Sequence, residues 1–102
     1  MREFFVYIVE CSDGLYYTGV TSDLDKRIKE HNAGIDNRAF TFRRRPVELL
    51  FCETFGDPDS AFRVEKQIKG WSRRKKKVLI DKDWDKLIEY SRNYTQKEIN
   101  DE

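Results

Sequence analysis

Two short runs of aromatic and β-branched residues, separated by a turn sequence, lie near the start of the chain. Residues 4–9 read FFVYIV and residues 15–20 read LYYTGV, and Ser12, Asp13 and Gly14 lie between them. Side chains of these types favour strands, and a Ser-Asp-Gly sequence favours a tight turn. The pattern therefore predicts a β-hairpin, which restricts the fold to one that contains antiparallel sheet.

The hairpin register decides which side chains share a face of the sheet. If Cys11 pairs with Leu15, Tyr7 lies opposite Gly19, and Tyr17 becomes a diagonal neighbour of Tyr7. A slip of one residue would place the two tyrosines on opposite faces. Gly19 would leave a patch of backbone that another group can approach closely. Hairpin tyrosines more often pack than catalyse, so both roles stay open at this point.

One helix and one further strand follow the hairpin. Ser22 or Asp23 is suited to cap a helix that ends near Gly34. Residues 35–45 lack clean periodicity and predict a loop or a short helical turn. Residues 47–55 follow a proline and predict a third strand.

A second helix begins with an acidic cap. Asp57 is followed by Pro58, which suits the first helical position, and the helix is predicted to end near Gly70. The basic segment 72–80 then leads to a last helix around Trp84, Leu87 and Ile88.

The order ββαβα plus C-terminal helices predicts an α+β fold, a small three-stranded antiparallel sheet flanked by helices. With 102 residues, the chain is expected to form a single domain over residues 1–94. The core that carries the motifs spans residues 4–78, and residues 95–102 are expected to be frayed.

Composition limits the cellular setting. An aromatic content of 14% argues against disorder. No apolar run reaches the roughly 20 residues needed to span a bilayer, and the charged start does not resemble a signal peptide, so we expect a cytoplasmic protein. Cys11 and Cys52 lie in apolar strand-like runs and are expected to be buried, reduced thiols.

Three ionisable side chains fall on or beside apolar helix faces. Helical geometry places Arg27 and His31 at the border of the stripe formed by Leu24 and Ile28, and it places Glu65 among the apolar residues of its helix. Arg27 can extend to solvent, and His31 can be a satisfied histidine at the core edge. A carboxylate on an apolar face needs a partner, which is either a cation or Arg27.

These residues share an order with a known family. The chain resembles the GIY-YIG nuclease domain over residues 4–78, and the segment 39–46 is similar to the small stand-alone bacterial members. The residues that carry the resemblance are Phe5-Val6-Tyr7, Tyr17-Thr18-Gly19, Arg27, His31 and Glu65.

The resemblance implies a role for each position. Tyr7 would help to activate the attacking water, and Tyr17 would contact the phosphate or support Tyr7. Arg27 and His31 would contact the region of the scissile phosphate, and Glu65 would hold one Mg²⁺ or Mn²⁺ ion. Tyr7 would need positive charge nearby to become a phenolate. Some members also use an asparagine after the glutamate, whereas residues 66–77 contain none.

Two basic clusters suit a nucleic-acid backbone. A solvated charged face is the alternative interpretation. We expect DNA rather than RNA as the partner, a monomer, and neither a membrane nor a small-molecule cofactor. The clusters are Arg43, Arg44 and Arg45, and Arg73, Arg74, Lys75, Lys76 and Lys77.

Three functional hypotheses result. The first is a Mg²⁺-dependent endonuclease, in its finer form a structure-selective one in DNA repair or recombination. The second is a catalytically silent nucleic-acid-binding module on the same fold, and the third is a protein-interaction domain that uses the basic surface. Core-facing Glu65 favours the first, because a binding module needs no carboxylate near phosphate.

Overall fold

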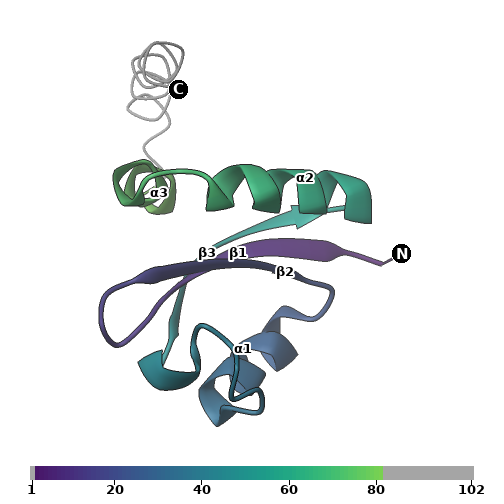
Figure 1. The fold of residues 1–102 in the computed structure, drawn as a ribbon. Coiled ribbons are helices and arrows are strands. Elements are labelled where there is room, and N and C mark those ends of the chain that lie inside the picture. Colours follow the sequence, from purple (N-terminus) through teal and green to yellow (C-terminus); the bar gives the residue numbers. More distant parts are fainter. Residues whose placement is uncertain (1, 82–102) are drawn as a thin grey trace. The chain divides into compact units, whose positions relative to one another are not determined.

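The computed structural model describes residues 2–81. Its element order confirms the predicted α+β class (Figure 1). The predicted helix around Trp84, Leu87 and Ile88 and the predicted frayed tail lie outside the described residues. In chain order the elements are β1 (Phe4–Glu10), β2 (Tyr16–Thr21), α1 (Leu24–Ala33), the short 3-10 helix η1 (Phe42–Arg44), β3 (Glu48–Phe55), α2 (Pro58–Lys69) and α3 (Arg73–Ile80).

The three strands form one antiparallel sheet with the order β2-β1-β3. The Cys11 amide donates to the Leu15 carbonyl over 2.8 Å, which closes the hairpin turn. Tyr7 lies opposite Gly19, as the predicted register requires. Strand β1 is therefore hydrogen-bonded along both of its edges.

A helix covers each face of the sheet, α1 on one and α2 on the other (Figure 1). Leu24 and Ile28 of α1 pack against a buried cluster that includes Tyr7 and Val9. Side chains alternate along a strand. Val6 and Ile8, on either side of Tyr7, therefore point to the opposite face, where α2 contacts the sheet.

The helix ends follow the predicted capping residues. The Asp23 carboxylate accepts a hydrogen bond from the Lys26 amide at the start of α1, and Gly34 follows the helix with φ 67°. A left-handed residue at this point suits glycine. Asp57 caps α2 in the same way, with Pro58 as the first helical residue.

The chain divides into two compact units, one that ends at Gly70 and one that begins at Trp71. In the second unit, the segment predicted as a basic lead-in is itself the helix α3. Ser72 explains the difference, because its hydroxyl caps α3 by accepting from the Lys75 amide over 3.2 Å.

The prediction of two buried thiols is correct for one cysteine only. Cys11 is buried, whereas Cys52 is exposed. Cys52 lies on β3, an edge strand whose only buried side chain is Phe51. Across the described residues, no helix has both the length and the apolar character needed to cross a bilayer.

Candidate active site

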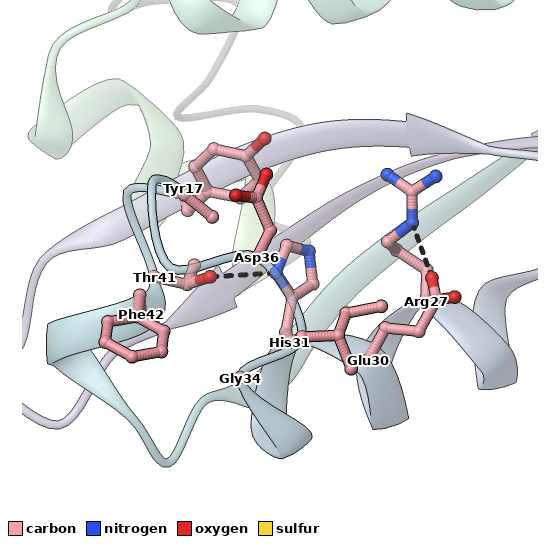
Figure 2. Close-up of a pocket in the computed structure, with 10 residues that line it drawn as sticks. Tyr17, Arg27, Glu30, His31, Gly34, Asp36, Thr41 and Phe42 are labelled. Atoms are coloured by element: carbon pink, nitrogen blue, oxygen red, sulfur yellow. Dashed lines mark hydrogen bonds and ion pairs between the residues drawn. The ribbon is translucent and has the colours of Figure 1, made fainter.

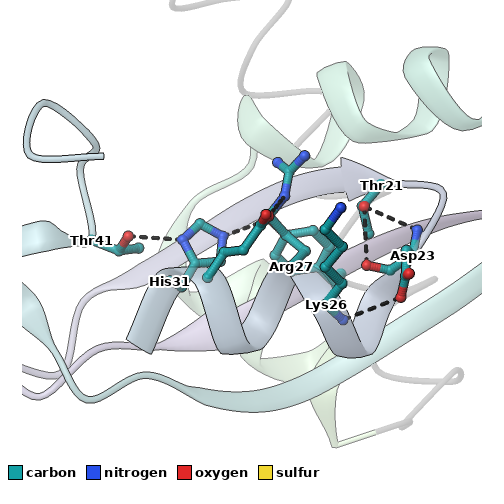
Figure 3. A network of polar contacts seen from close by, with 8 residues as sticks. Thr21, Asp23, Lys26, Arg27, His31 and Thr41 are labelled. Atoms are coloured by element: carbon teal, nitrogen blue, oxygen red, sulfur yellow. Dashed lines mark hydrogen bonds and ion pairs between the residues drawn. The ribbon is translucent and has the colours of Figure 1, made fainter. Parts of the chain in front are cut away.

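Two hydrogen bonds join three elements at the centre of the candidate site. The Tyr7 hydroxyl on β1 lies 2.8 Å from Nε2 of His31 on α1. Nδ1 of the same ring lies 2.9 Å from Oγ1 of Thr41, in the turn before η1 (Figures 2 and 3). Both ring nitrogens are therefore engaged, which fixes the orientation of the imidazole.

Burial determines the protonation of this chain of groups. Burial, and then the positive charge of Arg27, lower the pKa of His31 below 6.5, so the ring is neutral at pH 7. Burial raises the pKa of Tyr7 to about 12, although Arg27 acts in the opposite direction. The phenol is thus protonated and donates to Nε2, and the ring proton on Nδ1 is donated to Thr41. Arg27 does not favour the phenolate enough to outweigh burial.

Aromatic rings surround the imidazole. The ring centroid of Tyr17 lies 6.4 Å from that of Tyr7 and 5.5 Å from that of His31, in an edge-on arrangement with the imidazole. Phe40 stacks on Tyr17 at 5.9 Å. The two tyrosines therefore share a face of the sheet, as the predicted register requires.

Gly19 makes room for the Tyr7 ring. A Cβ atom at this position would lie 2.5 Å from Cζ of Tyr7, too close for any real contact. The group that approaches the backbone of Gly19 is therefore the phenol of Tyr7, its partner on the neighbouring strand. Absence of a side chain at Gly19 thus allows the Tyr7–His31 hydrogen bond.

A cleft of about 310 Å³ opens beside this cluster. Tyr17, Arg27 and His31 line it together (Figure 2). Nε of Arg27 lies 3.3 Å from the Glu30 carboxylate, and the Arg27 side chain is 43% exposed, so the guanidinium remains accessible. Tyr7 has no exposed surface and does not line the cleft.

Glu65 is directed inward from α2, as its position in the helix predicts. Its side chain is only 13% exposed, and Oε2 lies 2.7 Å from Nζ of Lys69. Of the two partners that the sequence leaves open for Glu65, a cation and Arg27, the structure contradicts Arg27. Lys69 is one helical turn further on α2, at the spacing where side chains meet, whereas Arg27 pairs with Glu30 of its own helix.

Glu65 can offer one carboxylate to a hard cation. Among residues 2–81, no group of three or more His, Cys, Asp or Glu side chains is assembled for a metal. Mg²⁺ is commonly held by one or two carboxylates together with water and substrate phosphate, so Glu65 alone can supply the protein ligand.

The predicted phosphate-binding arginines differ in their surroundings. Nε of Arg44 lies 3.0 Å from the Asp13 carboxylate, and its guanidinium lies 4.0 Å above the Phe40 ring. Arg45 donates to the Phe42 carbonyl over 2.7 Å. Arg43 is exposed. Arg44 and Arg45 therefore hold the loop around η1, and Arg43 is the better placed of the three to meet a phosphate.

The second cluster, on α3, also includes internal contacts. Lys75 is buried, and its Nζ lies 4.3 Å above the Trp71 ring. Lys77 forms a 3.2 Å ion pair with Asp81. Lys76 is half-buried, and Arg73 and Arg74 are exposed.

Sequence reasoning missed two residues of this region. Lys69 could have been found, because it follows Glu65 by four residues on a predicted helix. Thr41 gave no signal, because it lies in a stretch without periodicity and its contact with His31 depends on the tertiary fold.

Comparisons with known proteins identify the family of the chain. Residues 3–78 match the GIY-YIG catalytic domain. A UPF0213 protein of Halobacterium salinarum is 49% identical over 74% of this chain and 96% of its own length. The UPF0213 protein YazA of Bacillus subtilis is 43% identical over 76% of this chain and 77% of its own length. The chain therefore belongs to the GIY-YIG family, in its UPF0213 group.

Solved structures also share the fold. The solution NMR structure of a UPF0213 protein from Bacillus halodurans has a TM-score of 0.51 and 42% identity, and the match covers 78% of this chain and 83% of that one. The solution NMR structure of a protein from E. faecalis has a TM-score of 0.57 and 28% identity, covering 80% and 86%.

Proposed function

We propose that this protein is a divalent-metal-dependent endonuclease that hydrolyses phosphodiester bonds in nucleic acid, with DNA rather than RNA as its substrate. The observation that carries the proposal is the hydrogen-bonded chain from Tyr7 through His31 to Thr41, beside the guanidinium of Arg27. Phosphodiester hydrolysis needs a route for the proton of the attacking water and positive charge at the phosphate. The Tyr7–His31–Thr41 chain would supply the proton route once the cluster opens to substrate, and Arg27 would supply the positive charge.

Residues of the cleft would bind the scissile phosphate. Arg27 and Tyr17 both line the cleft, so a phosphate placed there can accept hydrogen bonds from the guanidinium and the phenol. Glu65 would hold the cation, which would supply charge neutralisation at the phosphoryl oxygens. The guanidinium of Arg27 would stabilise the phosphate most strongly in the transition state, where the phosphate carries the most negative charge.

Proton transfer would pass through Tyr7. Because its phenol is protonated at rest, Tyr7 cannot act as a preformed phenolate. It accepts a proton from water as its own proton passes to Nε2 of His31, and the imidazolium keeps its Nδ1 hydrogen bond to Thr41. Tyr7 is fully buried, so this step requires the aromatic cluster to open when substrate binds.

A nuclease screen tests the proposal. Purified protein is incubated with branched, flapped, nicked and single-stranded DNA, and with matched RNA, in Mg²⁺ or Mn²⁺ and in a chelator. We expect metal-dependent cleavage of DNA, and preference for one branched form would support a role in repair or recombination. Binding without cleavage of any substrate would favour the silent binding module instead.

Arg27→Ala provides the site-specific arm of the screen. Removing the guanidinium should lower cleavage about 10²- to 10³-fold while nucleic-acid binding falls only modestly. Lys26→Ala is the matched control, because Lys26 is an exposed cation on the same helix that does not line the cleft. Equal activity in the two variants would remove Arg27 from the site.

A further inference from the structure

Lys69 forms an ion pair with Glu65, the carboxylate that the cation would need. Its Nζ lies 2.7 Å from Oε2 of Glu65. Glu65 is 13% exposed, so it requires a positive partner whenever no metal is bound. In the structure that partner is an ammonium group from the same helix.

The ammonium also lies next to the aromatic cluster. Lys69 Nζ is 5.8 Å from the ring centroid of Tyr17, which lines the cleft. The Glu65 charge contributes to the raised pKa of Tyr7, so the carboxylate acts electrostatically on the buried phenol. The Lys69 side chain is 49% exposed. It can therefore move into solvent without disturbing the core.

We propose that Lys69 is a resident counter-ion of Glu65 that a divalent cation must displace in order to bind. This inference rests on the proposed function, because it takes Glu65 as the metal ligand. Ion pairs that are partly exposed are weak, so a divalent cation can replace the ammonium. Phosphate oxygens of bound nucleic acid add ligands to the cation and shift the competition toward the metal. Metal binding is thereby coupled to nucleic-acid binding.

Metal affinity of the nucleic-acid-free protein tests the competition. Mn²⁺ is titrated by calorimetry into the wild type and Lys69→Met, which keeps the length of the side chain and removes its charge. The control is Lys66→Met, an exposed lysine on the same helix with the same change in net charge. We expect Lys69→Met to bind Mn²⁺ about two- to fivefold more tightly than the control.

Thermal melts supply a second measurement. Without metal, Lys69→Met leaves Glu65 poorly paired and should melt below Lys66→Met; saturating Mn²⁺ should reduce this difference. Equal Mn²⁺ affinities in the two lysine variants, with Mn²⁺ binding abolished by Glu65→Gln, would overturn the role of Lys69 and leave the proposed function intact. Mn²⁺ binding that persists in Glu65→Gln would remove Glu65 as the ligand, and with it both proposals.

Discussion

The phenol oxygen of Tyr7 lies 2.8 Å from Nε2 of His31, although 24 residues separate the two in sequence. Tyr7 belongs to the middle strand of the sheet and His31 to the helix over one face, so their contact depends on the packing of α1 against β1. The same ring binds Thr41 through its other nitrogen. Three separate segments thus form the hydrogen-bonded chain of the proposed proton pathway.

Tyr7→Phe should break this pathway while keeping the ring in place. We expect cleavage to fall about 10²- to 10⁴-fold, the range for losing a group that transfers a proton, with nucleic-acid binding retained. Single-turnover cleavage rates measure the effect. Tyr16→Phe is the control, because Tyr16 precedes Tyr17 on β2 and its side chain therefore points to the opposite face of the sheet. Wild-type rates in Tyr7→Phe would exclude the phenol from the reaction.

The pKa of His31 should set the lower pH limit of cleavage. Burial lowers the pKa of His31 below its ordinary value of 6.5. The ring therefore stays neutral to a lower pH in the folded protein than in the unfolded chain. The stability due to the neutral ring is present above pH 6.5 and is lost as pH falls through the lower folded-state pKa. Cleavage should follow the same course. His31 is the only histidine of the chain, so NMR titration of its ring protons measures this directly; titration at or above pH 6.5 would contradict the assignment.

Thr41 should act by positioning His31. Thr41→Val removes the acceptor for the Nδ1 proton, and we expect cleavage to fall roughly 10- to 100-fold, the range known for residues that orient metal-binding histidines. Thr41→Ser keeps a hydroxyl and should restore most of the rate. Ring nitrogen chemical shifts provide the second readout, because Thr41→Val should mix the two imidazole tautomers. Unchanged shifts would reduce Thr41 to a packing residue.

Gly19→Ala tests the space beneath the Tyr7 ring. A Cβ atom there meets Cζ of Tyr7 at 2.5 Å, so the free energy of unfolding should fall by about 1–3 kcal/mol. Gly56→Ala is the control, because no atom lies within 4 Å of a Cβ at that position. Denaturant melts compare the two. Equal stabilities would mean that the ring moves aside without cost.

Arg43 and Arg44 should have separable effects. Arg43→Ala should lower the slope of log K against log salt by about one while leaving the melting temperature unchanged. Arg44→Ala should lower the melting temperature, because it removes the ion pair with Asp13 and the contact with Phe40. Fluorescence anisotropy and thermal melts measure both quantities. An unchanged salt slope in Arg43→Ala would favour a solvated face.

Local sequence rules predict much of this fold. Turn chemistry sets the hairpin register, and the register alone places Tyr7 opposite Gly19. Helical periodicity predicts the inward position of Glu65, and side-chain caps predict where α1 and α2 begin. These features depend on residues a few positions apart, so a sequence pattern can carry them.

The rest of the candidate site depends on tertiary packing. Thr41 reaches His31 only because the loop before η1 folds back onto α1. The pKa of Tyr7 is set by the depth of its burial. Neither feature follows from spacing along the chain.

The Tyr7–His31–Thr41 chain spans segments of unequal resistance to local opening. Tyr7 is held in a strand bonded on both edges, so its amide should exchange with deuterium only when the whole sheet opens. Thr41 lies in the turn before η1, which can detach at a lower free-energy cost. Low concentrations of urea should therefore abolish the proposed activity before circular dichroism detects any loss of the sheet.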